Sequence, residues 1–400
     1  MKLRVLLVGG PMYDPLYARI GEFEEREGIE VEKVLSRGHP DLNERISHEF
    51  RSGTADYNLI STHTKYAPSQ RQWLTPLDGD LEETASFSDR TLELARIDGA
   101  IYSVPRNLDV KLLHYRTDLL SAPPATWVEL LETAASLKSE NLHGFAFPGK
   151  ESGLFGHFFE LHAMYGGDMF EGDGPPVPRL DDEAGKAALV LLKELYEKAA
   201  PPETPDWHYE EVATCFRSGR AAMSTDWPGG FHVYEEEGSA ITGKYDLAQY
   251  PKGPAGRFVY GGCHSFAIPK MARDRGAAVE LLRFLTSRES QVFEARLGTL
   301  PARSDALEEA RAEAQPGSLA GRRWGLLAEV REAAITPPRH PNYPAVEDAI
   351  WEGVREALIG NKTVEQALAD TQEAARKAAI GGRTEEGASR NVPEESRRWH

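Results

Sequence analysis

The sequence predicts an α/β protein of two lobes, with the chain crossing between the lobes more than once. Residues 3–62 alternate between short apolar strands and amphipathic helices. Strand patterns return at residues 221–227, 245–251 and 263–269, with largely helical stretches before and after them. A chain of 400 residues is also longer than one compact domain usually is, so two or more lobes are expected.

The first unit of the chain is a strand, a helix and a second strand. Residues 3–10 (LRVLLVGG) predict a strand that ends at two glycines. Residues 14–28 predict a helix with Asp14 as N-cap, Pro15 at its first position and Gly28 at its end. Residues 29–35 (IEVEKVL) predict the second strand. Because the connections are short, we expect a parallel βαβ unit with a right-handed crossover.

A second helix and a third strand continue the same sheet. Residues 41–53 predict a helix with Asp41 as N-cap, and residues 57–62 (YNLIST) predict the strand. Ligands of open α/β sheets bind beyond the carboxyl ends of the strands. This rule selects the residues that follow the first and third strands, which are Met12, Tyr13, Asp14, Thr62, His63 and Thr64.

The pattern changes near residue 95. Asp98-Gly99 predicts a tight hairpin turn between two short strands, and residues 110–116 predict another strand. Capping boxes at Thr126/Glu129 and Thr363/Gln366 mark the starts of two helices. Residues 381–400 lack apolar periodicity, so we expect a disordered tail there.

Composition narrows the possible functions. The 63 acidic and 46 basic residues give a net charge of −17, which argues against nucleic acid or a membrane surface as the main partner. No apolar run approaches the ~20 residues that span a bilayer. The apolar N-terminal stretch is shorter than the core of a secretion signal, so either the protein is cytoplasmic or the leader is absent from this chain.

Motifs of catalysis and metal binding are missing from the sequence. It contains no GxGxxG, P-loop, HExxH or GxSxG pattern. His157 and His162 are five residues apart and do not share a helical face, so they do not predict a metal site. Cys215 and Cys263 are expected to be buried free thiols, with a single disulfide as the alternative. We therefore expect a protein that is not an enzyme, without cofactor or metal.

Aromatic and hydrogen-bonding residues gather instead at predicted strand ends and loops, as for Tyr13, His63, Tyr66, Asp109, Trp227, Tyr260 and His264. Aromatic faces offer apolar area to the C–H faces of a sugar, and carboxylates and imidazoles satisfy its hydroxyls. Trp227 stands where a strand ends, before Pro228 and two glycines. This position favours a ligand contact over a packing role.

Eleven segments, in order along the chain, resemble the family 1 extracellular solute-binding proteins of bacterial ABC importers, the maltose-binding-protein-like group. They include DLNERISHEFRSGTADYNLI, DGAIYSVPRNLDVKLLHYRTDLL, FRSGRAAM, GGCHSFAIPK and GTLPARSDAL. The resemblance implies a type II periplasmic-binding-protein fold, in which two lobes of mixed, mostly parallel sheet and helices close on a ligand. By position, it places the first lobe at 1–108 and 261–302 and the second at 109–260 and 303–380.

The resemblance also implies site residues. Asp109 stands where sugar binders of this family often place a carboxylate, and Arg303 matches an arginine that often reaches the cleft. Gly262 belongs to a Gly-Gly segment whose backbone approaches the ligand. With the residues already selected, the predicted ligand-binding set is Tyr13, Asp14, His63, Thr64, Asp109, Phe155, His157, Trp227, Tyr260, Gly262, His264 and Arg303.

The function implied is capture of a carbohydrate, followed by docking on the membrane permease of an importer. The protein would be a monomer located in the periplasm or at the cell surface. One alternative is an acidic or phosphorylated sugar, recognised by Arg106, Arg303 or the histidines at 39, 63, 157 and 264. Another alternative is a cytoplasmic sensor or enzyme built on the same fold.

Overall fold

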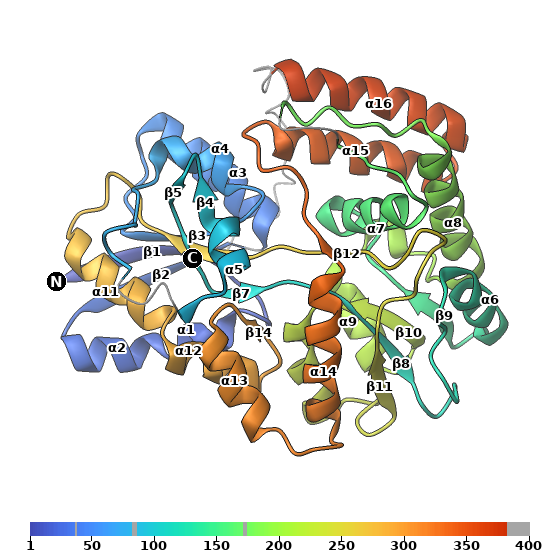
Figure 1. Cartoon of the computed structure of the whole chain (residues 1–400), viewed down its shortest axis with the longest axis horizontal. Coiled ribbons are helices and arrows are strands. Elements are labelled where there is room, and N and C mark those ends of the chain that lie inside the picture. The colour runs from blue at the N-terminus through green and yellow to red at the C-terminus, as the bar shows by residue number, and fades with distance from the viewer. Residues whose placement is uncertain (37, 82–85, 171–173, 382–400) are drawn as a thin grey trace.

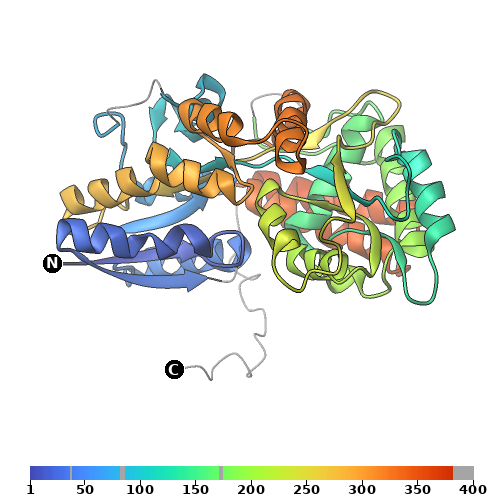
Figure 2. The same cartoon turned by 90° about the horizontal axis from the view of Figure 1, so that it is seen from below.

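Two sheets with their helices form two bodies that lie side by side (Figures 1 and 2). The computed structural model describes residues 1–36, 38–81, 86–170 and 174–381. The first sheet has the order β2-β1-β3-β13-β6, from strands Glu30–Ser36, Lys2–Val8, Leu59–His63, His264–Ala267 and Val104–Pro105. The second has the order β11-β8-β10-β9, from Tyr245–Ala248, Leu112–Arg116, Ala221–Asp226 and His143–Ala146. The α/β class is confirmed.

Strand β1 lies inside the first sheet and is apolar on both faces. It pairs in parallel with β2 and β3, as predicted, while β13 runs antiparallel to β3. Leu3, Val5 and Leu7 belong to one core cluster. Leu6 and Val8 point to the opposite face and belong to another. The helices of this lobe are α1 (Asp14–Ala18), α2 (Ile20–Glu27), α3 (His39–Ser52), α4 (Ala67–Gln70), η1 (Arg71–Trp73), α5 (Asp89–Ala95), α11 (Arg275–Leu285) and α12 (Arg288–Arg296).

Two predicted helix starts are corrected by the structure. The N-cap of α1 is Tyr13, and Asp14 is the first helical residue. The Asp14 carboxylate instead accepts a 3.0 Å hydrogen bond from the backbone N–H of Gly10, which closes the loop after β1. Helix α3 begins at His39 and not after Asp41, because Pro40 fits the first turn of a helix. His39 consequently starts the helix that follows β2.

The second lobe contains a larger set of helices. They are α6 (Trp127–Leu137), α7 (Glu151–Met164), α8 (Glu183–Ala199), α9 (Tyr209–Arg217), α10 (Phe231–Glu235), α14 (Leu319–Glu332), α15 (Tyr343–Leu358) and α16 (Val364–Gly381), with the short turns η3 (Thr204–Asp206) and η4 (Pro228–Gly230). Of these, α8 and α16 are the longest in the described structure. Helix α7 is buried on all its faces and forms the centre of the largest core cluster. The predicted capping box at Thr363/Gln366 is confirmed with both of its hydrogen bonds. At Thr126 the hydroxyl accepts from Glu129 N as predicted, but the Glu129 carboxylate accepts from Ala125 N, one residue before the N-cap.

The chain crosses between the two sheets through short strand pairs. Strand β7 (Asn107–Leu108) pairs with β14 (Leu300–Pro301), and β12 (Val259–Tyr260) pairs with β15 (Ala334–Ile335). Helix α13 (Ser304–Glu313) then packs against α12, where Arg296 pairs with Glu313. The exact lobe boundaries stay a prediction, and the predicted tail beyond Gly381 lies outside the described residues.

Smaller predictions are also resolved. The Asp98-Gly99 hairpin is confirmed between β4 (Arg96–Ile97) and β5 (Ala100–Ile101), with positive φ angles of 48° and 85° at the two turn residues. Cys215 and Cys263 are both buried free thiols. Across the described ranges, every helix is too short or too polar to cross a membrane.

Candidate functional site

A small cavity lies where the strand ends of the first sheet meet the second lobe. It is lined by Met12, Tyr13, Arg106, Asn107, Asp109, Trp227, Gly229, His264, Glu294 and Thr299. Its volume is about 10 Å³, which is room for about one water molecule. Pockets for small molecules usually measure about 300–1,000 Å³. The lobes are therefore closed on one another, and a ligand needs them to separate or the side chains to rearrange.

A hydrogen-bonded network of imidazoles around Asp109 forms the polar side of the cavity. Asp109 Oδ2 lies 3.0 Å from His264 Nε2 and 3.6 Å from His63 Nε2. His39 Nε2 lies 2.5 Å from His264 Nδ1 on the other side of that ring. The Tyr13 hydroxyl lies 3.3 Å from His264 Nε2. These side chains come from the starts or ends of α3, β3 and β13, from the loop after β1 and from a crossing segment.

Burial controls the charges in this network. It lowers the pKa of His63 to about 4, against the opposing effect of Asp109. Burial, followed by the neighbouring His264 ring, holds the pKa of His39 well below its usual range. Burial alone would raise the pKa of Asp109, but His264 and His63 hold it below its usual range. At neutral pH an ionised carboxylate therefore faces imidazoles of which His39 and His63 are neutral, each with one donor and one acceptor nitrogen.

Aromatic rings form the opposite wall around Trp227. Trp227 follows β10, and its ring centroid lies 5.2 Å from that of Tyr209 and 6.1 Å from that of Tyr260. The Lys111 ammonium lies 5.6 Å from the Trp227 ring centroid. Within the described part of the chain, the buried hydroxyls of Tyr209 and Tyr260 have no hydrogen-bond partner. Because an unpaired buried hydroxyl is unfavourable, both are suited to receive polar groups of a ligand.

One buried ion pair lines the cavity, and two more are buried near the side chains that form its walls. Lys111 pairs with Glu160, and Arg106 pairs with Glu294 while its guanidinium also donates to the backbone oxygen of Tyr13. The third pair joins the lobes, because Lys65 follows β3 whereas its partner Glu347 lies on α15. Each of these cations thus already has a buried carboxylate partner.

Comparison with known proteins places the chain in a family. A family model described as bacterial extracellular solute-binding protein matches residues 18–320. The chain belongs to this family. Maltose-bound MalE3 of T. maritima has a TM-score of 0.87 to it at 26% identity, covering 94% of this chain and 99% of that one. The predicted family and the two-lobed fold of periplasmic solute-binding proteins are thereby confirmed.

Relatives of this solute-binding protein carry different ligand names. A probable amino-acid ABC transporter periplasmic-binding protein of Sinorhizobium fredii is 25% identical, over 93% of this chain and 88% of the relative. A maltooligosaccharide ABC transporter solute-binding lipoprotein of Streptococcus pneumoniae is 23% identical, over 76% of this chain and 73% of the relative. A solute-binding protein of Thermotoga lettingae bound with α-D-tagatose shares the fold, with a TM-score of 0.85, 23% identity and coverage of 94% and 99%.

Seven of the twelve predicted site residues come together in this solute-binding protein, at the cavity or directly behind its walls. They are Tyr13, His63, Asp109, Trp227, Tyr260, Gly262 and His264. Thr64 is buried next to them, but its hydroxyl donates to the backbone oxygen of Cys263 at 3.2 Å. His39, considered only for an acidic ligand, joins the same network.

Four predicted residues lie elsewhere. Asp14 is exposed, and Phe155 is fully buried in the second lobe, stacked on Phe159. His157 is buried with its Nδ1 atom 3.1 Å from the Tyr250 hydroxyl. Arg303 pairs with Asp305 at 2.8 Å and does not line the cavity.

Several residues that line the cavity, or that contact the Trp227 ring behind its wall as Lys111 and Tyr209 do, were not predicted. Asn107 and Lys111 flank Asp109 in the segment PRNLDVK, so proximity in sequence to a selected carboxylate was a usable signal. Tyr209 and Glu294 lie on helices far from it in sequence, at the starts or ends that face the cavity. No local pattern distinguishes them from core or surface positions.

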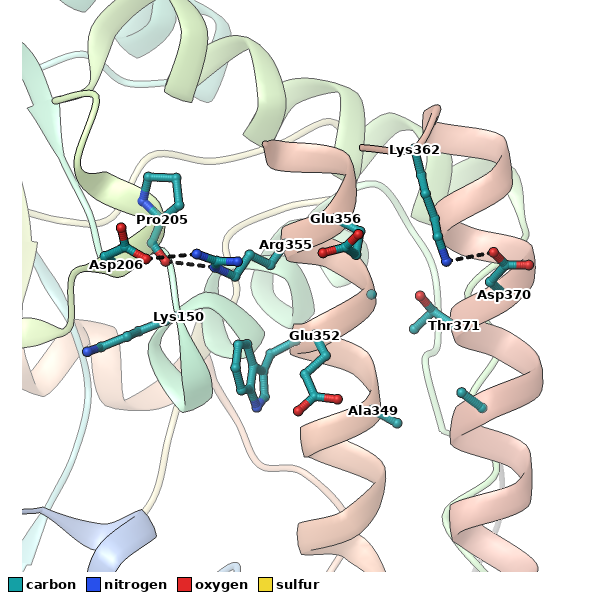
Figure 3. A pocket seen from close by; sticks show the side chains of 13 residues that line it. Lys150, Pro205, Asp206, Ala349, Glu352, Arg355, Glu356, Lys362, Asp370 and Thr371 are labelled. Carbon is teal, nitrogen blue, oxygen red and sulfur yellow. Dashed lines mark hydrogen bonds and ion pairs between the residues drawn. The ribbon is translucent and has the colours of Figure 1, made fainter. Parts of the chain in front are cut away.

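A second groove of about 630 Å³ lies on the outside of the second lobe (Figure 3). It runs between α15 and α16 and the loop near Pro205. Four of its charged residues form two ion pairs, Arg355 with Asp206 and Lys362 with Asp370. The first lobe contributes nothing to its lining, so closure of the lobes does not act on it.

Proposed function

We propose that this protein is the ligand-capturing subunit of a bacterial ABC importer, that it is not an enzyme, and that its ligand is a neutral carbohydrate. One observation carries the choice of ligand: the cavity opposes a wall of aromatic rings to a network of imidazoles and one carboxylate. Sugars present C–H faces to rings and hydroxyls to such donors and acceptors. The unpaired hydroxyls of Tyr209 and Tyr260 add two further polar contacts.

Closure of the lobes is the proposed mechanism. The open protein admits the sugar, and the lobes then remove it from water between Trp227 and Asp109. The ion pair of Lys65 with Glu347 links the lobes in the closed form, and separation of these two side chains breaks the link. The closed monomer then docks on a membrane permease outside the cytoplasm. Genes for permease and ATPase components beside the gene of this protein would support this proposal, whereas their absence together with turnover of a sugar would favour the enzyme alternative.

Neutral ligands are preferred over acidic ones because the available cations are already paired. Arg106 pairs with Glu294, and Arg303 pairs with Asp305. An acidic sugar remains the second candidate, since histidines adjoin the cavity. Esterification of the ligand's acidic group distinguishes the two: unchanged affinity contradicts recognition of the acid.

Calorimetry against mono- and oligosaccharides, sugar acids and amino acids tests the ligand class. We expect saturable binding of one or more neutral sugars, accompanied by a change in tryptophan fluorescence. Amino acids are included because one relative is named as a probable amino-acid transporter binding protein. Binding of amino acids alone would remove the carbohydrate proposal.

Replacing Trp227 by alanine is expected to weaken sugar binding about 30-fold, or about 2 kcal/mol, because a central aromatic contact is lost. Trp227 is only half-buried, so the melting temperature should change little. Trp351→Ala is the matched control, since Trp351 lines the outer groove on α15. Unchanged affinity of the Trp227 variant would transfer the role to Phe231 or Tyr260.

A further inference from the structure

Three buried side chains at the edge of the first sheet have the spacing of a metal site. One ligand atom from each of His63, Asp109 and His264 lies within 4.8 Å of the other two. His264 Nε2 is 3.0 Å and His63 Nε2 is 3.6 Å from Asp109 Oδ2. Ligand atoms of a tetrahedral Zn²⁺ site, each ~2.1 Å from the ion, lie about 3.4 Å apart. The observed separations bracket this value.

Strand register and backbone hydrogen bonds hold these side chains in place. His63 and His264 are register partners on the antiparallel strands β3 and β13, so both rings project from the same face. Asp109 N donates to Gly262 O at 2.9 Å, and Gly262 N donates to Asp109 O at 3.1 Å. A Cβ atom on Gly262 would lie 2.6 Å from His63 Nε2. Glycine at this position therefore leaves room for the ring.

Outer hydrogen bonds orient two of the three side chains. His264 Nδ1 lies 2.5 Å from His39 Nε2, and Asn107 Nδ2 donates to Asp109 Oδ1 at 2.9 Å. Partners of this kind fix the ring and carboxylate orientation in metal sites. The backbone N–H of Lys65 points to His63 Nδ1 at 3.3 Å. Binding of an ion at Nε2 places the ring proton on Nδ1, so this long contact is given up.

We propose that His63, His264 and Asp109 bind a divalent transition-metal ion of the Zn²⁺ class at the wall of the interlobe cavity, with His39 as a positioning residue. Two imidazoles and one carboxylate are the protein ligands of open zinc sites, whereas Mg²⁺ and Ca²⁺ prefer oxygen ligands. Asp109 and His264 line the cavity, so the open coordination position faces the space between the lobes. The proposal goes beyond the carbohydrate function and does not depend on it.

Titration of untagged, chelator-treated protein with ZnCl₂ in the calorimeter tests the site, with no sugar present. We expect one Zn²⁺ per chain, no comparable binding of MgCl₂ or CaCl₂, and visible absorption bands of tetrahedral Co²⁺ when CoCl₂ is used. Loss of an outer hydrogen-bond partner typically weakens metal binding by ~10–100-fold, and we expect a loss of this size for His39→Gln. Asp109→Asn and His264→Gln each remove a ligand and should weaken Zn²⁺ binding by more than this.

His48→Gln is the matched control, because His48 is an exposed histidine on α3, the helix that His39 begins. It should bind Zn²⁺ as the unchanged protein does. Asp109→Asn keeps the shape of the side chain, so it remains informative if a histidine variant does not fold. Equal affinity in the Asp109 and His48 variants would overturn the proposal, as would Zn²⁺ binding at other histidines only. Sugar binding without Zn²⁺ binding overturns this site and leaves the carbohydrate proposal intact. Zn²⁺ binding without sugar binding supports this site and contradicts the carbohydrate proposal.

Discussion

Replacing Glu160 by glutamine is expected to lower the free energy of unfolding by about 3–5 kcal/mol, because it leaves a buried ammonium without its counter-charge. Lys111 Nζ lies 2.7 Å from Glu160 Oε2, and both side chains are fully buried. Glu160 Oε1 also accepts a 2.6 Å hydrogen bond from the backbone N–H of Tyr260. One carboxylate therefore joins α7, the crossing segment with Lys111 and strand β12.

The pKa shifts of Lys111 and Glu160 show that burial disfavours the charged form of both groups. Burial lowers the pKa of Lys111 and raises that of Glu160, and in each case the partner opposes the shift. With glutamine in place of Glu160, only the burial effect on Lys111 remains. Chemical denaturation at neutral pH measures the loss.

Two variants separate the charge effect from other causes. Lys111→Met/Glu160→Gln should recover most of the stability, because no charge remains buried and the amide oxygen still accepts from Tyr260 N. Glu194→Gln removes a carboxylate from an exposed pair with Lys198 and should change stability by less than about 1 kcal/mol. If the double variant is as unstable as Glu160→Gln alone, burial of an uncompensated charge is not the cause.

The sequence was sufficient for the parts of the site that depend on strand ends. Tyr13 follows β1 and His63 is the last residue of β3, two parallel strands of one sheet whose carboxyl ends share an edge. His264 could be placed beside them only through the family resemblance, since β13 joins the sheet about 200 residues later. Its register opposite His63 needed the structure.

Two of the predicted site residues lie on α7, away from the cavity. Helical periodicity identifies a binding face only when another face meets solvent, and α7 is buried all round. On α7 periodicity therefore could not separate site from core, and the predicted site residues Phe155 and His157 pack in the core. Glu160 lies on the same helix, and nothing in its spacing distinguishes it from a surface carboxylate.

The histidine group of the proposed metal site also has no signal in the sequence. The histidines tested by sequence spacing were His157 and His162, which share a helix. The group that the fold assembles comes from residues 63, 109 and 264, whose separations along the chain carry no ligand pattern. A site built across a sheet register is visible only after the strands are paired.

Replacing Asp226 by asparagine is expected to stabilise the protein by up to about 3 kcal/mol above pH 7 and to change little near pH 4. Burial raises the pKa of Asp226 to about 6, although hydrogen bonds to Tyr234 and Trp227 oppose the shift. Both donors, the Tyr234 hydroxyl and the Trp227 backbone N–H, are neutral. The ionised carboxylate is thus held in a buried site without a charged donor.

The sign of the pH dependence follows from proton binding. The folded protein keeps this proton up to about pH 6, whereas the unfolded chain releases it near pH 3.8. Between these values the folded state binds more protons, so this group's contribution to stability is complete below pH 3.8 and is lost as pH rises through 6. Asparagine resembles the protonated acid: its oxygen can accept from Trp227 N, and its amide can donate to the Tyr234 oxygen.

Denaturation of both proteins at several pH values between 4 and 8 measures this difference. The gain of the Asp226→Asn variant should grow through pH 4–6 and then level off, because the carboxyl group is fully ionised above that range. Asp56→Asn is the control, since Asp56 is exposed and its removal should shift stability by a small amount. A gain that is constant with pH would mean that Asp226 is already ionised at pH 4 in the folded protein. In that case Asp226 would be charged over the whole range from pH 4 to pH 8, and the aromatic wall around Trp227 would adjoin an ionised carboxylate at every pH tested.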